Sequence, residues 1–399
     1  MSLRRSLPPT RLPPSSSLRR WPHGRVRTIA VVHDWLVTAG GGEQVLAEVL
    51  REFPNADLFS SIDKMSASDR DRLGLKTVHT SPLQSLPRVG RYYRSLLPLM
   101  PWAMRRLDVR AYDLVISISH AVAKGVVTHP GQTHICLCLS PMRYAWDLRE
   151  QYLDESGLSR GVKGWLARTM LDRMQRWDLA NSASVTGFIA ISEYVADRIE
   201  RAYGRSSTVI YPPVDTDYFT PVGHEQRDDH YVTASRFVQY KRLDLIVRAF
   251  AGMPEKKLTV IGDGPDWEKV RRAATPNVTL LGRQPGEVLR AELRSARAFV
   301  FAADEDFGIA PVEAQAWGTP VIAYGKGGAL ETIRGLDDAK PTGVFFADQT
   351  DAGIQNAVAQ FELNAGRIAK AACRENAERF GVARFRAELR QLVGATTEK

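Results

Sequence analysis

Short apolar runs alternate with amphipathic stretches along most of the chain. The amphipathic stretches repeat apolar residues every three or four positions, as Val45, Leu46, Val49 and Leu50 do. This period indicates helices, whereas nearly continuous apolar runs indicate strands that are buried on both faces. The predicted strands are Ile29–His33, Leu114–Ser119, Ile135–Leu139, Phe188–Ile191, Tyr231–Ser235, Leu258–Ile261, Val278–Leu281, Phe299–Ala302 and Pro320–Ala323.

The alternation predicts an α/β fold with parallel sheets. Near mid-chain, Tyr211 is followed by Pro212 and Pro213. Two prolines resist both helix and central strand, so we predict a hinge there. The expected architecture is two Rossmann-like, doubly wound domains whose strands end across a cleft, where such sheets bind ligands. The predicted parts are a basic extension (1–27), a first domain (28–212), a second domain (213–375) and a C-terminal helix (376–399) that could pack back on the first domain.

The composition places the chain among ordinary globular proteins. It has 399 residues, of which 44% are hydrophobic and 25% charged, and no apolar run approaches the roughly 18 residues of a membrane-spanning helix. The three cysteines have neither metal-site spacing nor the density of a disulfide framework, which suits a reducing cytosol.

The net charge of +9 is concentrated in two regions. Residues 1–27 contain seven arginines and no acid, and we predict that this segment is disordered and is not a secretory signal. It is either the product of a start codon placed too far upstream or a membrane tether. A second basic cluster runs from Arg88 to Arg110. Because the charge is local and no zinc-finger or RNA-binding pattern accompanies it, nucleic acid is not an expected partner.

The most specific candidate site is the stretch DEDFGIAPVEAQAWG, residues 304–318. It follows a predicted strand and opens a helix near Pro311, where proline is tolerated. A helix start offers free N–H groups and partial positive charge to a diphosphate, which Phe307, Gly308 and Ile309 are predicted to line. Glu313 in the first turn could accept hydrogen bonds from ribose hydroxyls, and Glu305 would face a transferred sugar. The alternative is that both glutamates merely favour a helix N-terminus.

A pair of cations follows another predicted strand. Arg236 and Lys241 lie on one strand-to-helix loop, where they could stabilise a departing diphosphate without a metal ion. Solvated basic residues are the alternative, but cations at a helix start oppose its dipole. Gly262, Asp263 and Arg283 also follow strands and could line a nucleobase pocket, although glycine turns are routine there.

Three further groups follow strands in the first half. The turn with Gly41 and Gly42 could let a ligand approach bare backbone, or could be a tight turn only. His120 ends a strand, where it could bind a sugar hydroxyl, although a lone histidine is more often structural. The third group is Arg143, Tyr144, Trp146 and Asp147. These residues combine stacking and hydrogen-bonding groups, which suits the binding of a carbohydrate. The alternative is that they pack against a face of the domain.

Together these motifs resemble the retaining glycosyltransferases of the GT-B fold, in family 4, over about residues 28–380. The Glu-x7-Glu pattern at Glu305 and Glu313, with Arg236 and Lys241, carries the resemblance. It implies that the cations hold the donor diphosphate, that Glu313 binds the ribose and Glu305 the donor sugar, and that the Gly41–Gly42 loop closes on the phosphates. His120 matches a histidine that often bonds the donor sugar. The resemblance further implies front-face attack without an enzymic nucleophile, and neither a metal nor another cofactor.

The segments VVHDWL, GGGEQVL, SHAVAKGV and SPMRYAWDLREQYL are similar to those of bacterial mannosyltransferases that use GDP-mannose to build O-antigen or exopolysaccharide units. A UDP-glucose or UDP-N-acetylglucosamine donor is the main alternative. A non-catalytic sugar-nucleotide-binding scaffold is a further alternative, and a nicotinamide oxidoreductase lacks its glycine fingerprint here.

The stretch 86–107 mixes arginines with tyrosine, leucine, methionine and tryptophan. This composition is typical of an interfacial helix on anionic lipid, and an ordinary helical segment is the alternative. We therefore expect a cytoplasmic protein that docks on the inner face of the cytoplasmic membrane and delivers sugar to a lipid-linked oligosaccharide.

Overall fold

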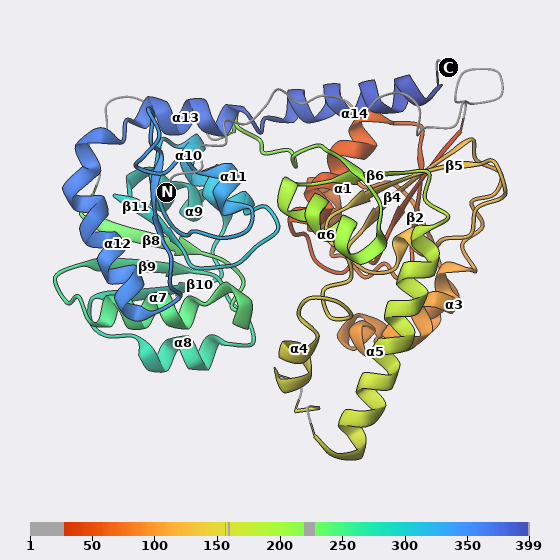
Figure 1. The fold of residues 1–399 in the computed structure, drawn as a ribbon, viewed down its shortest axis with the longest axis horizontal. Coiled ribbons are helices and arrows are strands. Elements are labelled where there is room, and N and C mark those ends of the chain that lie inside the picture. Colours follow the sequence, from red (N-terminus) through yellow and green to blue (C-terminus); the bar gives the residue numbers. More distant parts are fainter. Residues whose placement is uncertain (1–27, 156, 159, 219–227, 398–399) are drawn as a thin grey trace. The chain divides into compact units, whose positions relative to one another are not determined.

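The computed structural model describes residues 28–155, 157–158, 160–218 and 228–397. The chain forms two compact units, each with its own parallel sheet and helices (Figure 1). The first unit comprises the residues up to Ile191, Val195–Ile210 and the residues from Ala387 onward, and the second comprises Ser192–Tyr194 and Tyr211–Arg386. The predicted extension of residues 1–27 lies outside the described residues.

The first sheet has the strand order β3-β2-β1-β4-β5-β6-β7, and every neighbouring pair is parallel. Strands β1 and β4 lie side by side although β2 and β3 separate them in sequence, so the order reverses there. The strands are β1 (Ile29–His33), β2 (Asp57–Ser60), β3 (Val78–Thr80), β4 (Leu114–Ser119), β5 (Thr133–Cys138), β6 (Gly187–Ala190) and β7 (Ser207–Val209). The helices of this part are α1 (Gly41–Glu52), α2 (Ala67–Leu73), α3 (Met100–Met104), α4 (Arg149–Glu155), α5 (Gly161–Ser182) and α6 (Glu193–Tyr203).

The second sheet repeats this plan with the order β10-β9-β8-β11-β12-β13. Its reversal lies between β8 and β11, which are paired in parallel. The strands are β8 (His230–Ala234), β9 (Lys257–Ile261), β10 (Val278–Gly282), β11 (Ala298–Phe301), β12 (Val321–Tyr324) and β13 (Gly343–Phe346). The helices that follow are α7 (Leu243–Ala251), α8 (Trp267–Ala273), α9 (Gly286–Ser295), α10 (Ile309–Ala316), α11 (Ala329–Thr332), α12 (Asp351–Asn364), α13 (Lys370–Glu378) and α14 (Val382–Thr397).

Each unit has a separate apolar core. In the first, strand residues such as Val32 and Val115 pack with Met100 and Met104. In the second, residues such as Val300 and Phe250 pack with Phe361 of α12. The predicted fold class, two Rossmann-like α/β domains with parallel sheets, is therefore confirmed.

The stretch 86–107 differs from the interfacial helix that its composition predicts. It forms short turns of 3-10 helix at Val89–Arg91 and Tyr93–Leu99, followed by the five-residue helix α3. Pro98 lies inside the second turn and Pro101 at the start of α3, and proline interrupts helical hydrogen bonding. Much of the apolar content, including Met100 and Met104, is buried in the core. Exposed apolar side chains remain at Leu86, Tyr92, Leu99 and Trp102.

The C-terminal helical pattern is also divided. Helix α13 ends at Glu378 and α14 begins at Val382. The chain passes from the first unit to the second at Tyr211 and returns to the first at Ala387. The boundaries predicted from the sequence lie after residues 212 and 375. In the first unit, Arg390 of α14 donates to Glu52 at the end of α1, with Nε–Oε1 at 2.6 Å.

Candidate active site

Asp34 organises the strand ends of the first unit. It follows β1 and is fully buried, and its carboxylate accepts the backbone N–H groups of the turn that follows β4. These donors belong to His120 (2.7 Å), Ala121 (3.1 Å), Val122 (2.6 Å) and Ala123 (2.6 Å). A carboxylate that accepts several N–H groups satisfies a whole turn at once. Asp34 therefore fixes the backbone on which His120 is carried.

The same carboxylate holds the His120 ring. His120 Nδ1 lies 2.8 Å from Asp34 Oδ2, and the imidazole remains 35% exposed. Burial lowers the pKa of His120, but the charge and hydrogen bond of Asp34 raise it more, so the pKa is above its usual value. Burial likewise raises the pKa of Asp34, and the charge of His120 outweighs this and lowers it well below its usual range. Since Nδ1 is engaged by Asp34, Nε2 is the nitrogen that can meet a substrate.

The glycine turn belongs to a helix and not to a loop. Gly41 and Gly42 are the first residues of α1, and the Gly40 N–H donates to Glu43 Oε2 at 2.9 Å. A Cβ on Gly42 would lie 2.9 Å from Leu139 Cδ1, a contact that a movement of the leucine side chain would relieve. The N–H groups at this helix start suit an anion, and the closing of the segment on the phosphates, which the resemblance implies, stays a prediction.

The predicted carbohydrate-binding residues are partly engaged in the fold. Trp146 Nε1 donates to Asp178 Oδ2 at 2.9 Å, and Asp147 accepts from Arg198 Nε at 2.5 Å. Burial raises the pKa of Tyr144 well above its usual value. Arg143 lies near enough to His120 for its charge to lower the histidine pKa. Their role toward an acceptor stays a prediction.

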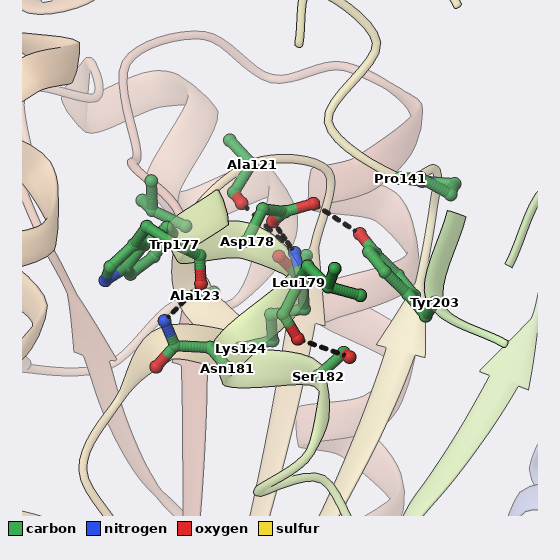
Figure 2. Close-up of polar contacts among 12 residues, drawn as sticks. Ala121, Ala123, Lys124, Pro141, Trp177, Asp178, Leu179, Asn181, Ser182 and Tyr203 are labelled. Carbon is green, nitrogen blue, oxygen red and sulfur yellow. Dashed lines mark hydrogen bonds and ion pairs between the residues drawn. The ribbon is translucent and has the colours of Figure 1, made fainter. Parts of the chain in front are cut away.

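Beneath these residues lies a buried polar cluster that the sequence analysis missed. Figure 2 shows Lys124 in ion contact with Asp178, whose other oxygen accepts the Tyr203 hydroxyl at 2.7 Å. Burial lowers the pKa of Lys124, but the charge of Asp178 raises it more, so the ammonium stays charged. The cluster joins the turn after β4 to α5 and α6. A lysine inside the apolar sequence AVAKGVV was the available sign, since buried lysines are rare unless paired.

In the second unit, Lys241 and Glu305 form an ion pair. Lys241 ends the short turn after β8, and Glu305 lies in the loop after β11. Because β8 and β11 are neighbours and parallel, their carboxyl ends bring the two side chains together. Arg236 lies on the same loop as Lys241 and is exposed to solvent. The structure thus joins two of the predicted catalytic residues at the reversal of the strand order.

Glycines allow the loops around Arg236 to touch. Gly262 has φ of +132°, and a Cβ there would lie 1.8 Å from Ser235 O. The Phe237 N–H donates to Asp263 O at 2.9 Å. Gly262 is therefore needed for the packing of these loops. The side chains of Asp263 and Arg283 are exposed.

The loop of residues 304–308 is held against its neighbour. Glu305 O accepts the Gly328 N–H at 2.8 Å. Gly308 has φ of +86° and begins α10 at Ile309, two residues earlier than predicted. Glu313 is consequently the fifth residue of the helix and lies in its second turn, whereas it was predicted in the first turn. Burial raises its pKa to about 7.

Phe307 packs inside the unit. Its ring lies 5.9 Å from Tyr211 and 5.3 Å from Phe380, centroid to centroid, and the residue is buried. The side chain thus takes part in packing, and its place in the lining of a donor site stays a prediction. Ile309 is half-buried at the start of α10.

The fold and these strand-end loops define a two-domain protein of GT-B architecture. Residues 215–380 match the family model "Glycosyl transferases group 1", which falls in the second unit. Two solved structures share the fold: HepE of Anabaena in complex with UDP (TM-score 0.67, 15% identity, covering 92% of this chain and 100% of that one) and sucrose-phosphate synthase of Thermosynechococcus elongatus (TM-score 0.68, 18% identity, 92% and 98%).

Curated relatives match part of the chain. A GDP-mannose-dependent alpha-(1-6)-phosphatidylinositol monomannoside mannosyltransferase of Mycolicibacterium smegmatis is 31% identical over 203 residues, which is 43% of this chain and 51% of the relative. A GDP-mannose-dependent monoacylated alpha-(1-6)-phosphatidylinositol monomannoside mannosyltransferase of Corynebacterium glutamicum is 34% identical over 172 residues, 36% and 45% of the two chains. The chain thus spans about half the length of the curated relatives it matches.

Proposed function

We propose that the protein is a glycosyltransferase that moves mannose from GDP-mannose to a lipid-linked saccharide in bacterial surface polysaccharide synthesis. One observation carries the proposal: Lys241 and Glu305 meet at the strand reversal of the second unit, beside the start of α10. A cation and a helix N-terminus stabilise a leaving diphosphate, and the adjacent carboxylate faces the sugar. The family match of residues 215–380 supports the activity, and the names of the mannosyltransferase relatives support the donor.

In this proposal, each residue has one task. Lys241 and Arg236 bind the diphosphate oxygens, and Glu313 accepts hydrogen bonds from ribose hydroxyls. His120 presents Nε2 to a sugar hydroxyl while Asp34 holds Nδ1. The acceptor oxygen attacks the anomeric carbon on the same face from which the diphosphate leaves. The bond between the anomeric carbon and the phosphate oxygen breaks, and the departing phosphate takes the proton of the acceptor hydroxyl. The configuration is retained, and no metal ion takes part.

The test is release of nucleoside diphosphate from purified protein with a panel of nucleotide sugars. GDP-mannose is expected to be the preferred donor, and activity is expected to persist in EDTA. Preference for UDP-glucose or UDP-N-acetylglucosamine would replace the donor assignment. If the protein binds a sugar nucleotide but shows no turnover with any of the acceptor extracts tested, a non-catalytic scaffold would be favoured.

Replacing Glu305 tests the site directly. Glu305→Ala removes the partner of Lys241 and the group that faces the sugar, so turnover is expected to fall by about a hundredfold or more. The exposed Glu287→Ala is the control, because it removes the same charge from the second unit. A Glu305→Ala variant that folds and keeps full turnover would contradict the assigned role.

We also propose that the protein docks on the inner face of the cytoplasmic membrane through residues 86–107. Among the described residues no helix is long and apolar enough to cross a bilayer. The exposed Leu99 and Trp102 lie among the arginines of this stretch, and Arg106 stands over the Trp102 ring at 5.4 Å. Neutralising Arg88, Arg91, Arg94, Arg105 and Arg106 is expected to abolish co-sedimentation with anionic liposomes, and unchanged binding would refute this surface.

A further inference from the structure

The first turns of α5 carry exposed apolar side chains. Val162, Trp165 and Leu166 are 75%, 65% and 55% exposed. Their spacing of three and four residues puts them on one face of the helix. Single exposed apolar residues are ordinary, but a contiguous group of this size on one helix face marks an interaction surface.

The other half of α5 anchors the helix. Leu171, Met174 and Asp178 are buried, and Asp178 holds the polar cluster with Lys124 (Figure 2). In Figure 1, α4 and the beginning of α5 project from the body of the first unit. The helix is therefore fixed at its end and presents its first turns to the surroundings.

Basic residues outnumber acidic ones along the first half of α5, whereas the neighbouring α4 carries Glu150, Asp154 and Glu155. Arg168 Nη2 lies 3.3 Å from Glu150 Oε2, so the cations next to the apolar group are Arg160 and Lys163. Residues 160–176 contain Asp172 as their one acid, and Arg149 Nη1 lies 2.7 Å from Asp172 Oδ1, which offsets that charge. The same stretch contains five basic residues: Arg160, Lys163, Arg168, Arg173 and Arg176. An apolar face bordered by arginine and lysine complements an anionic lipid surface. The charged ends of these two side chains reach the lipid phosphates, while their aliphatic parts remain in apolar surroundings.

We propose that the first turns of α5 form a second membrane-docking surface, in addition to residues 86–107. Val162, Trp165 and Leu166 enter the boundary between headgroups and acyl chains, and Arg160 and Lys163 pair with lipid phosphates. Tryptophan prefers this depth because its ring is apolar and its N–H is polar. A second copy of the chain is a poorer partner, since it would bring two cationic rims together.

The experiment is co-sedimentation of the full chain with phosphatidylcholine vesicles that contain phosphatidylglycerol, compared with phosphatidylcholine alone. We expect the wild-type protein to prefer the anionic vesicles and to lose binding as salt is added. The double variant Trp165→Ser with Leu166→Ser is expected to weaken binding by about tenfold or more. Arg160→Gln with Lys163→Gln is expected to weaken the preference for anionic lipid, since the arginines of residues 86–107 remain.

Leu363→Ser is the matched control, because this residue of α12 is 80% exposed and lies in the second unit. It should leave vesicle binding unchanged. Equal binding by the wild type and the Trp165→Ser, Leu166→Ser variant would overturn the inference. Sedimentation velocity on the same pair provides the other refuting outcome: an oligomer lost in the variant, with vesicle binding intact, would assign the surface to self-association.

This inference extends the membrane-side acceptor of the proposed function, but its test does not depend on catalysis. Vesicle binding is measured without donor or acceptor. Failure of the α5 surface would leave nucleotide-sugar turnover unaffected, whereas failure of the donor panel would leave vesicle binding unaffected.

Discussion

At the scale of single residues, two carboxyl groups, the buried Asp34 and the half-buried Glu313, have opposite electrostatic environments. Asp34 accepts four backbone N–H groups and faces His120, so it is held as an anion. Glu313 meets only the cost of burial, which raises its pKa to about 7. Asp34 is thus suited to hold a histidine, whereas Glu313 gains from a partner that donates hydrogen bonds to it.

The raised pKa of Glu313 makes a prediction about stability. Above pH 7 the folded protein holds an unfavourable, half-buried charge on Glu313, and below the unfolded value of 4.5 this group is protonated in both states. The contribution of this group to stability therefore falls as the pH rises from 4.5 through about 7. Glu313→Gln should raise the melting temperature of the second unit at pH 8 and should change it little at pH 4.5.

The same group predicts how ligand affinity changes with pH. If Glu313 accepts ribose hydroxyls as a carboxylate, the affinity for GDP should rise as the pH passes through about 7. Calorimetric titration from pH 6 to pH 8 measures this, with Glu313→Gln as the comparison. An equally strong pH dependence in the variant would place the titrating group elsewhere.

At the scale of elements, loops are brought together by glycines that no side chain could replace. A Cβ on Gly262 would meet Ser235 O at 1.8 Å, and the residue also has positive φ. Gly328 is similar, since a Cβ there would lie 2.3 Å from Phe307 Cα. These loops thus depend on backbone contact between elements that are distant in sequence.

Gly262→Ala should therefore lower the free energy of unfolding of the second unit by about 2 kcal/mol or more, because both strain and overlap are introduced. Affinity for a nucleoside diphosphate should fall with it, since Arg236 is carried on the displaced loop. Gly366→Ala is the control, as open space surrounds that position and its φ is ordinary. Urea unfolding of both variants measures their free energies of unfolding. A similar loss of stability in the two variants would show that the contact between Gly262 and Ser235 is not important.

Helix α5 is tied to the turn after β4 by the Lys124–Asp178 pair. Removing one partner leaves an uncompensated buried charge, which typically costs about 3–5 kcal/mol, whereas replacing both with apolar residues is often neutral. We expect Asp178→Leu to destabilise the first unit strongly and the double variant Lys124→Met with Asp178→Leu to recover most of the loss. Chemical denaturation of the four proteins of the cycle measures the coupling, and simple additivity would contradict it.

At the scale of the whole molecule, two separate cores predict two unfolding transitions. A nucleoside diphosphate should stabilise the unit that contains Arg236 and Glu313, by about 2.7 kcal/mol when the ligand is at 100 times its Kd. Differential scanning calorimetry should show the shift in one transition. An equal shift of both transitions would argue against a site confined to the second unit.

Much of this architecture could be predicted from the sequence, because long apolar runs and helical periods dominate it. The strands Ile29–His33 and Leu114–Ser119 were predicted with their observed ends. The short strands β2, β3, β7 and β13 were not, since runs of three or four residues barely differ from loops. In the same way, Lys241 and Glu305 could be proposed from motifs, but their contact depends on the pairing of β8 with β11.

What could not be predicted were contacts between distant residues. Nothing near Asp178 in the sequence marks it as the partner of Lys124, and nothing near Asp34 marks the four N–H groups that it accepts. The segment 86–107 was predicted from its composition to form an interfacial helix, whereas the structure buries Met100 and Met104 of this segment in the core. Hydrophobicity alone does not distinguish a core residue from a binding one.

The assignment of the last residues of α14 to the first unit has a consequence for biosynthesis. Leu389 and Val393 are buried, and Arg390 holds Glu52. The ribosome therefore synthesises the whole of the second unit, which ends at Arg386, before it adds the last residues of the first. The domain that begins first is completed last, and a gene fragment cut at Tyr211 would encode a first domain that lacks its closing helix.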